Sequence, residues 1–160
     1  MLTGFDLLPT DTDRLRRLAA SMGAGEELPA NLRFEQSAPT GLPAADDSFD
    51  VIFSWSTFEH VLRPVEMARE MRRVLKPDGV VMIQLWPFYH SEHGSHLWEW
   101  YPEGFVHLRE LPDAIEAEVR AESHPEPDWI DDRLEEFRTL NRITVDELQA
   151  ALHSGGLRVA

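Results

Sequence analysis

The sequence predicts an α/β fold, a Rossmann-like, doubly wound parallel sheet with an aromatic and acidic insertion. Along residues 2–86, short apolar runs alternate with amphipathic stretches at helical spacing, a pattern typical of parallel strands joined by crossover helices. The run 50–55 is almost continuously apolar, which favours a strand covered by helices on both faces. Between residues 87 and 141 this alternation stops, and aromatic, histidine and acidic residues take its place.

The first part of the predicted sheet contains two strands with a helix between them. Residues 2–7 form a short apolar run that contains an acid near its end, which predicts a buried strand. Residues 32–35 predict a second strand. The intervening helix ends at Gly23, and the apolar positions that recur at helical spacing within it are Leu15, Leu18, Ala19 and Met22.

The second part repeats this order along the chain. Residues 50–55 predict the third strand, and Pro64 suits the first turn of the helix that follows it. Residues 77–79 (Pro-Asp-Gly) predict a turn into a fourth strand at 80–86. The inner face of the helix is expected to carry Ala68, Met71, Val74 and Leu75.

A last helix is predicted near the end of the sequence. Thr144 and Glu147 form a capping box that opens it, and residues 157–160 are expected to begin another strand. The chain is therefore predicted to be one domain over residues 1–160. Its parts are a sheet-forming core (1–86), an insertion (87–141) and a C-terminal helix with the start of a strand (142–160).

Composition excludes several classes of function. The formal net charge of −14 argues against binding to nucleic acid, whose phosphates require a basic surface. The sequence contains no cysteine, which excludes disulfides, thiolate nucleophiles and cysteine-based zinc sites. No apolar run approaches the roughly 20 residues that a membrane span needs, so we expect a cytoplasmic protein without a membrane partner. An acidic protein of this kind suits neutral or cationic small molecules.

Three segments carry a family resemblance: LPAADDSFDVIFS at 42–54, FEHV at 58–61 and RVLKPDG at 73–79. In this order they resemble the small-molecule (methyltransferase type 11-like) branch of the class I S-adenosylmethionine-dependent methyltransferases. The resemblance covers residues 2–86 well and 142–159 loosely. It implies S-adenosylmethionine as cofactor and a small-molecule methyl acceptor. It also makes 1–86 the cofactor-side core and 87–141 a lid or substrate insertion.

The resemblance further implies which residues hold the cofactor. Asp6, with Leu7 beside it, matches the acid that binds the ribose hydroxyls in this family. The alternative is that Asp6 only caps a turn. Ala38 stands where the family often has an acid for the adenine amino group, and neighbouring Ser37 is a possible substitute. The positions that would line the methionine portion are Ser54 and Trp55.

No catalytic residue is predicted firmly, and His60 is the candidate for a general base. An alternative is that Glu59 orients His60 to cap the next helix. The substrate pocket is expected to involve Tyr89, His90, His93, His96 and Trp98. The three histidines form an H-x-x-H-x-x-H pattern, but Gly94 and Ser95 interrupt any helix that would align them. We therefore predict no metal site.

One feature of the family is missing from these 160 residues: the glycine-rich turn that approaches the cofactor closely. We therefore expect an incomplete sheet without the first and last strands, a piece of a longer protein, and weak binding of S-adenosylmethionine. An exposed strand edge would make a homodimer possible. The alternative function is a degenerate, non-catalytic module that binds a partner through its acidic, tryptophan-rich segment. A nucleotide-dependent dehydrogenase is a weaker alternative, because it would need the same glycine turn.

Overall fold

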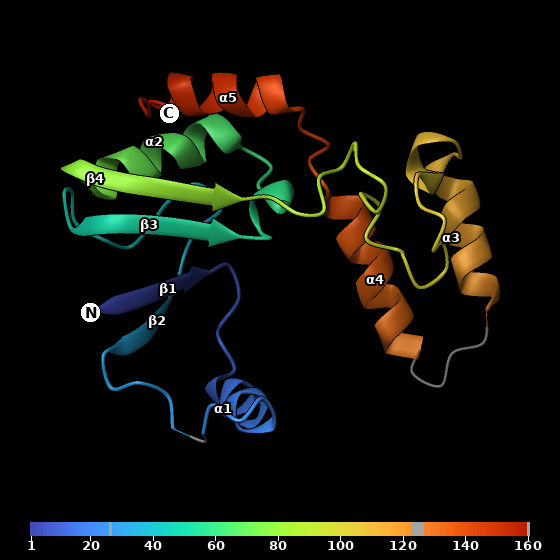
Figure 1. The fold of residues 1–160 in the computed structure, drawn as a ribbon, viewed down its shortest axis with the longest axis horizontal. Helices are drawn as coiled ribbons and strands as arrows, with labels where there is room; N and C mark the ends of the chain where they lie inside the picture. Colours follow the sequence, from blue (N-terminus) through green and yellow to red (C-terminus); the bar gives the residue numbers. More distant parts are fainter. Residues whose placement is uncertain (26, 123–126, 160) are drawn as a thin grey trace.

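The computed structural model describes residues 1–160 except residue 26, residues 123–126 and residue 160. Its strands form two parallel pairs that run in the same direction in Figure 1, which confirms the predicted α/β fold with parallel strands. The first pair is β1 (Leu2–Asp6) with β2 (Leu32–Gln36), and the second is β3 (Phe49–Trp55) with β4 (Leu75–Gln84).

The two strand pairs lie next to each other without a shared hydrogen-bond ladder among the described strands. In the first pair, Leu2 lies opposite Leu32 and the register continues without a shift to the last residue of each strand. The rings of Phe5 and Phe49 meet edge to face with their centroids 5.9 Å apart. Side-chain contact, and not strand pairing, therefore joins β1 to β3.

Helix α1 (Thr12–Ser21) connects β1 to β2 and lies on the outside of the molecule (Figure 1). The Asp11 side chain caps its first turn by accepting from the Arg14 amide at 2.8 Å. The predicted helix is confirmed, but none of its residues is fully buried, and Leu18 and Met22 are exposed. Its apolar side chains therefore contribute little to a core among the described residues.

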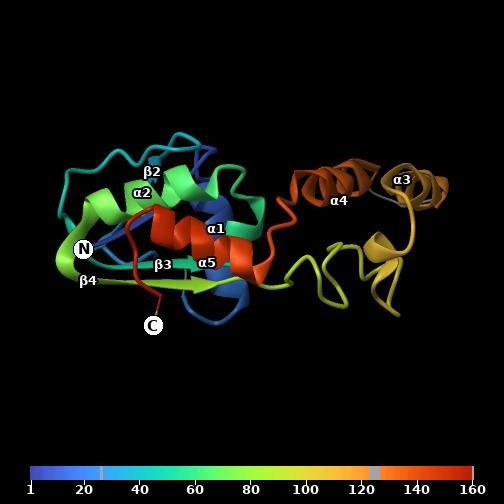
Figure 2. The ribbon, with the colours of Figure 1, turned by 90° about the horizontal axis from the view of Figure 1, so that it is seen from above.

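Helices α2 (Pro64–Val74) and α5 (Val145–Ser154) pack together over one face of the β3–β4 pair (Figures 1 and 2). The predicted capping box of α5 is present, because Thr144 and Glu147 each bond the main chain of the other. Gly155 ends α5 against α2, where an added Cβ would lie 2.3 Å from the Ala68 Cβ. The buried residues of this contact are Ala68, Met71, Val74 and Ala151.

The opposite face of the β3–β4 pair is exposed, contrary to the expectation of helices on both faces. Phe53 is 62% exposed and Trp55 71% exposed. The strand alternates with a period of two, so one set of side chains faces α2 and α5 while the other faces outward. Among the described residues no element covers the outward set, which comprises Val51, Phe53, Trp55, Val80 and Met82.

Two local expectations were wrong. The predicted turn at 77–79 is part of β4, which begins at Leu75 directly after α2, and the register shifts between Phe49 and Val51. An ion pair of 2.7 Å between Lys76 Nζ and Asp50 Oδ1 joins the strands there. Residues 157–159 form no strand, and residue 160 lies outside the described residues.

Residues 87–141 lie beyond the carboxyl ends of the strands and build a core of their own (Figure 1). They contain the helices α3 (Pro112–Ala121) and α4 (Pro127–Thr139). Asn141 holds this segment to the sheet, because its Nδ2 donates to the Phe58 and Val61 carbonyls at 2.8 and 2.9 Å. The core of the segment consists of Tyr89, Leu97, Val106, Ile115, Val119, Ile130, Leu134, Phe137 and Leu140.

None of the described helices is both long enough and apolar enough to cross a membrane.

Candidate functional site

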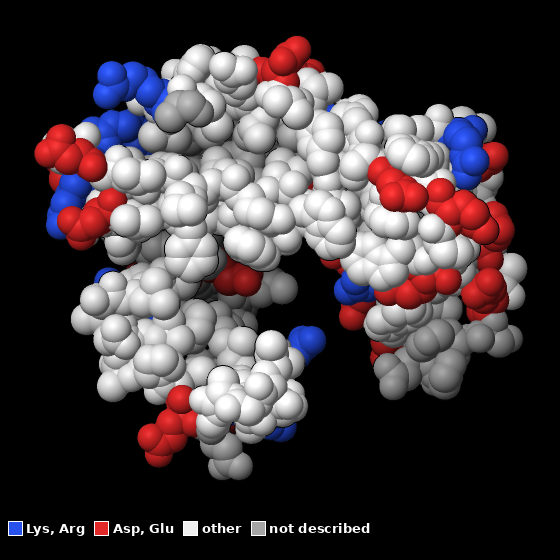
Figure 3. All heavy atoms as spheres, in the orientation of Figure 1, with Lys and Arg blue, Asp and Glu red and all other residues white. Residues whose placement is uncertain are grey.

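The strands β1, β3 and β4 all end on the same side of the molecule, facing residues 87–141 (Figure 1). Figure 3 shows an open hollow on this side, between the strands and the helices α3 and α4. Ligands of open α/β sheets bind outside the carboxyl ends of the strands. This edge is therefore the candidate functional site, and most of the residues predicted from the sequence lie along it or in the segment that it faces.

At the end of β1, Asp6 and Ser37 are brought together by the main chain. The Ser37 amide donates to the Asp6 carbonyl at 2.7 Å, so the two residues lie side by side at the ends of β1 and β2. The Asp6 side chain is exposed, and its Oδ1 accepts from the Leu8 amide at 2.9 Å. Its Oδ2 has no hydrogen-bond partner among the described residues, so one carboxylate oxygen remains available to a ligand.

Leu7 and Ala38 complete this group of predicted cofactor residues. Leu7 is exposed, and its carbonyl accepts from Gln36 Nε2 at 2.8 Å. Ala38 is exposed and forms an isolated antiparallel bridge with Gly41, which closes a tight loop after β2. Ala38 has no side-chain donor or acceptor, so the main chain and Ser37 are the polar groups at this position.

At the end of β3, Ser54 is half-buried and Trp55 is exposed. Ser56 follows with φ at 44°, a left-handed conformation that is uncommon for a residue with a side chain. Gln84 holds it there, because the Gln84 Oε1 accepts from the Ser56 amide at 2.9 Å and from its hydroxyl at 3.0 Å. This backbone outlier lies where a ligand would contact the strand ends, as strained residues often do.

Beyond Ser56, the short 3₁₀ helix Phe58–His60 places Glu59 and His60 next to His96. The rings of His60 and His96 meet edge to face with centroids 5.5 Å apart. Glu59 is only 2% exposed, and neither of its oxygens has a hydrogen-bond partner among the described residues. Burial raises the pKa of Glu59 and lowers the pKa of His60. This contact was not predicted from the sequence, because His96 lies 36 residues beyond His60 along the chain.

The predicted substrate residues fall into two groups. Tyr89 and His96 are buried, and Tyr89 belongs to the core of residues 87–141. His90, His93 and Trp98 are exposed or half-buried. His90 lies 3.1 Å from the Arg142 carbonyl, and Trp98 stacks on Trp86 with centroids 6.5 Å apart. The three histidines of the H-x-x-H-x-x-H pattern therefore have different surroundings, and only His96 joins Glu59 and His60.

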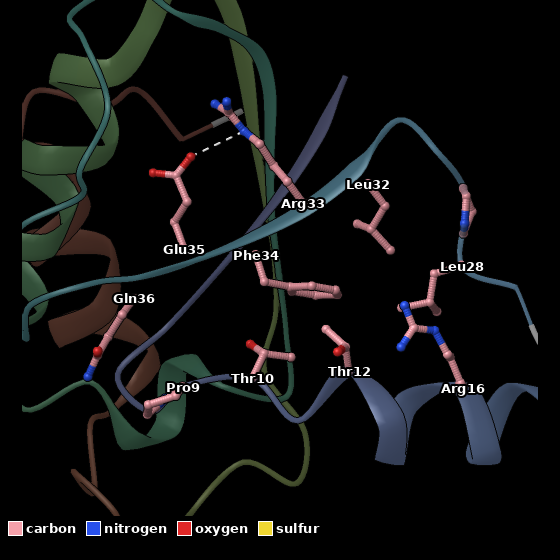
Figure 4. A pocket seen from close by; sticks show the side chains of 11 residues that line it. Pro9, Thr10, Thr12, Arg16, Leu28, Leu32, Arg33, Phe34, Glu35 and Gln36 are labelled. Atoms are coloured by element: carbon pink, nitrogen blue, oxygen red, sulfur yellow. Dashed lines mark ion pairs between the residues drawn. The ribbon is translucent and has the colours of Figure 1, made fainter.

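A hollow of about 480 Å³ lies between α1 and β2, with Thr12, Arg16 and Phe34 among the side chains that point into it (Figure 4). Arg33 forms an ion pair of 3.2 Å with Glu35 at one end of this lining. None of the residues predicted to bind cofactor or substrate lines the hollow, so it is separate from the strand-end site.

Comparison with known proteins identifies the core that carries these strand ends. A family model described as a methyltransferase domain matches residues 1–83, more than half of the chain. An uncharacterized methyltransferase of Mycobacterium tuberculosis (strain ATCC 25618 / H37Rv) is 43% identical over 68 residues, which cover 39% of this chain and 27% of the relative. An uncharacterized methyltransferase of Mycolicibacterium paratuberculosis is 32% identical over 92 residues, which cover 58% of this chain and 34% of the relative. The chain thus spans about a third or less of these relatives.

A solved structure supports the fold over nearly the whole chain. It belongs to the complex between the Haloferax volcanii Trm112 methyltransferase activator and a methyltransferase, and the likeness covers 99% of this chain and 51% of that one. The TM-score is 0.55 with 20% sequence identity, so this likeness concerns the fold alone. Together with the family match, it shows that the chain belongs to the class I S-adenosylmethionine-dependent methyltransferases.

Proposed function

We propose that the protein takes part in methyl transfer from S-adenosylmethionine to a small-molecule acceptor. The observation that carries this proposal is the match of residues 1–83 to the methyltransferase domain, together with the available carboxylate oxygen of Asp6 at the strand ends. When bound, S-adenosylmethionine supplies an activated methyl group, so the protein's main tasks are to align the reactants and to exclude water.

The residues at the strand ends suit parts of the cofactor. Asp6 offers a carboxylate for two ribose hydroxyls, and charge-assisted hydrogen bonds of this kind are the strong ones. The exposed indole of Trp55 offers a face to a cation such as a sulfonium. Ser37 supplies the polar side chain at the adenine position, where Ala38 supplies none. The 160 residues contain no glycine-rich turn after an apolar strand, so we propose that this chain binds the cofactor weakly.

The acceptor is proposed to bind between the strand ends and residues 87–141, which would act as a lid. Trp86 and Trp98 stack at this side and offer aromatic surface to an organic molecule. His60 is the candidate base when the acceptor must lose a proton. Its Nδ1 lies 3.2 Å from the Thr139 hydroxyl, and burial lowers its pKa, so the ring is neutral near pH 7 and able to accept a proton.

Thermal unfolding in the presence of S-adenosylmethionine tests cofactor binding directly, because a ligand that binds only the folded state raises the melting temperature. We expect a rise for the wild type at saturating cofactor. The substitution Asp6→Asn should weaken binding by roughly tenfold or more, since a hydrogen bond to a charged group contributes about 1.5–3 kcal/mol. Asp78→Asn is the matched control, because Asp78 is exposed at the opposite end of β4. No rise for the wild type would contradict the proposal.

The acceptor class is tested with methyl-labelled S-adenosylmethionine. The protein is incubated with the small-molecule fraction and, separately, with the macromolecular fraction of an extract of the source cells. We expect the label to move into the small-molecule fraction. Transfer into protein or nucleic acid would contradict the small-molecule acceptor and leave the family assignment intact.

A further inference from the structure

Two buried side chains, Glu59 and His96, converge with the half-buried His60 beside the carboxyl end of β3. One donor atom each of Glu59, His60 and His96 lies within 4.8 Å of the donor atoms of the other two. Both oxygens of Glu59 and the Nε2 of His96 are buried and have no hydrogen-bond partner in the described part of the chain. Leaving a buried carboxylate and a buried imidazole nitrogen unpaired costs several kcal/mol in general, so such groups normally have a hydrogen-bond partner, a bound water or an ion.

The hydrogen bonds around the two rings set which nitrogen is left for a ligand. The Thr139 hydroxyl donates to the Glu136 carbonyl at 3.0 Å, so it accepts from the Nδ1–H of His60 at 3.2 Å. The Nδ1 of His96 lies 3.3 Å from the Glu136 Oε1, and a carboxylate can only accept. In its neutral form each ring therefore carries its proton on Nδ1 and has the lone pair on Nε2.

This is the arrangement found around metal-binding histidines, whose second nitrogen donates to a carboxylate, hydroxyl or carbonyl that fixes the ring. Glu136 has that role for His96, and Arg133 lies 2.6 Å from the other oxygen of Glu136. The outer contacts of a metal site are thus already in place.

We propose that Glu59, His60 and His96 form a binding site for a divalent first-row transition metal ion, with zinc as the favoured ion. Two imidazole nitrogens and one carboxylate oxygen are the ligand set of many zinc sites that leave one position open. The same set holds ferrous iron in other proteins. Magnesium and calcium are disfavoured, because they prefer ligand sets made of oxygen.

The spacing of the ligand atoms is slightly wider than a bound metal requires. Zinc bonds of about 2.1 Å at tetrahedral angles separate the ligand atoms by about 3.4 Å. The three donor atoms lie within 4.8 Å of one another, so binding would draw them together by up to roughly 1.4 Å.

This inference goes beyond the proposed methyl transfer and changes one part of it. A metal ion would take the lone pair that His60 needs in order to act as a base. The open position of the metal would then hold water or an oxygen of the acceptor, and a metal-bound water gives up a proton near neutral pH. Metal binding is measured without cofactor or acceptor, so its failure would leave the methyltransferase proposal untouched.

The experiment measures binding of zinc ions to the full, untagged protein by calorimetry, with the bound metal counted by elemental analysis after dialysis. We expect one tightly bound zinc ion per chain. Glu59→Gln and His96→Gln should each weaken binding by more than 100-fold, because each removes a ligand. Glu136→Gln should weaken it by about 10–100-fold, the usual effect of losing an outer contact.

The matched control is His153→Gln, which removes an exposed histidine of α5 far from the site and should leave binding unchanged. Circular dichroism shows whether each variant is folded, and His60→Gln takes the place of any ligand variant that is not. A wild type that binds less than one zinc ion per chain would overturn the proposal. So would equal loss of binding in His90→Gln and His93→Gln, because the metal would then be held by the loop histidines.

Discussion

The first 57 residues and the segment 87–141 differ in how they bury their side chains. No described residue between positions 1 and 57 is fully buried, although this part carries most of the family match. Residues 87–141, where the alternation of strands and helices stops, contain a cluster of nine buried apolar side chains. A segment can therefore match the family in sequence without containing a packed core. The family motifs lie in turns that face the ligand, whereas a core requires only enough apolar side-chain volume.

Two identical substitutions, one in each region, should differ most in their effect on stability. Phe137→Ala removes a side chain that is 1% exposed in the core of 87–141 and should lower the free energy of unfolding by about 3–5 kcal/mol. Phe53→Ala removes one that is 62% exposed on the sheet and should cost less than about 0.5 kcal/mol. Urea denaturation followed by tryptophan fluorescence measures both. An equal cost would mean that the exposed sheet face is covered in solution, and a dependence on protein concentration would identify a second copy as the cover.

The close contact between α5 and α2 gives a second test. Gly155→Ala would place a Cβ 2.3 Å from the Ala68 Cβ, so the helices must separate, at a cost of about 1–3 kcal/mol. The backbone angle at Gly155 is ordinary, so the effect is purely one of space. Gly41→Ala is the control, since its Cβ would lie 3.6 Å from the nearest atom. Thermal unfolding of the two variants should differ clearly, and equal melting temperatures would contradict the close packing.

A third test addresses the connection between the two regions. Asn141→Ala leaves the half-buried carbonyls of Phe58 and Val61 without their donor and should cost about 1–2 kcal/mol. Asn31→Ala is the control, because the Asn31 side chain is exposed and has no hydrogen bond to any residue that the structure describes. Hydrogen exchange should show the added loss of protection near residues 58–61. Loss of protection confined to residues 112–139 would contradict this role of Asn141.

The smallest effect is expected at the exposed end of the sheet, where Arg73 holds the loop before β3. Its guanidinium donates to Glu70, to Asp46 and to the carbonyls of Leu42 and Ala44. The Arg73 hydrogen bond is the main cause that lowers the pKa of Glu70. Because the pKa of Glu70 is lower in the folded than in the unfolded protein, ionised Glu70 stabilises the fold at pH values above its unfolded-state pKa. This stabilisation is lost as the pH falls through its folded-state pKa.

We therefore expect Glu70→Gln to lower stability near pH 7 by less than about 1 kcal/mol, because the pair is partly exposed. The difference between the variant and the wild type should shrink as the pH falls through the lowered, folded-state pKa of Glu70, since Glu70 then becomes protonated in the wild type as well. Urea midpoints measured between pH 3 and pH 7 give the comparison. A difference that persists at low pH would show that Glu70 acts through packing and not through its charge.

Sequence patterns predicted the order of strands and helices through β4, because alternation and capping are local properties. The capping box at Thr144 is an example, since both of its partners lie within four residues. The inclusion of Pro77 in β4 could not be predicted, because it depends on the distant strand β3, where Lys76 forms an ion pair with Asp50 and the register shifts between Phe49 and Val51. The preference of the Pro-Asp-Gly sequence for a turn is a local property, and the contact with β3 overrides it.

The candidate site was predictable only where the residues follow a strand directly. Asp6 and Ser54 lie at strand ends as the sequence indicated. The meeting of Glu59 and His60 with His96 depends on how residues 87–141 fold back against the sheet, over a separation of 36 residues along the chain. The H-x-x-H-x-x-H pattern suggests that His90, His93 and His96 act together, but only His96 contacts Glu59 and His60. Spacing along a loop does not determine which side chains meet. Glu59 itself carried a signal, since an acid between Phe58 and His60 is an unusual residue to bury.

The Asn141 hydrogen bonds give the molecule a route for communication between sites. The main-chain amide of Asn141 also donates to the Glu59 carbonyl at 2.8 Å. The main chain of Glu59 is therefore attached to the segment that follows α4. A molecule that moves α4 on binding to residues 87–141 must therefore change the position of Glu59. Coupling of this kind is reciprocal, so whatever binds at Glu59 changes the affinity for that molecule by the same factor.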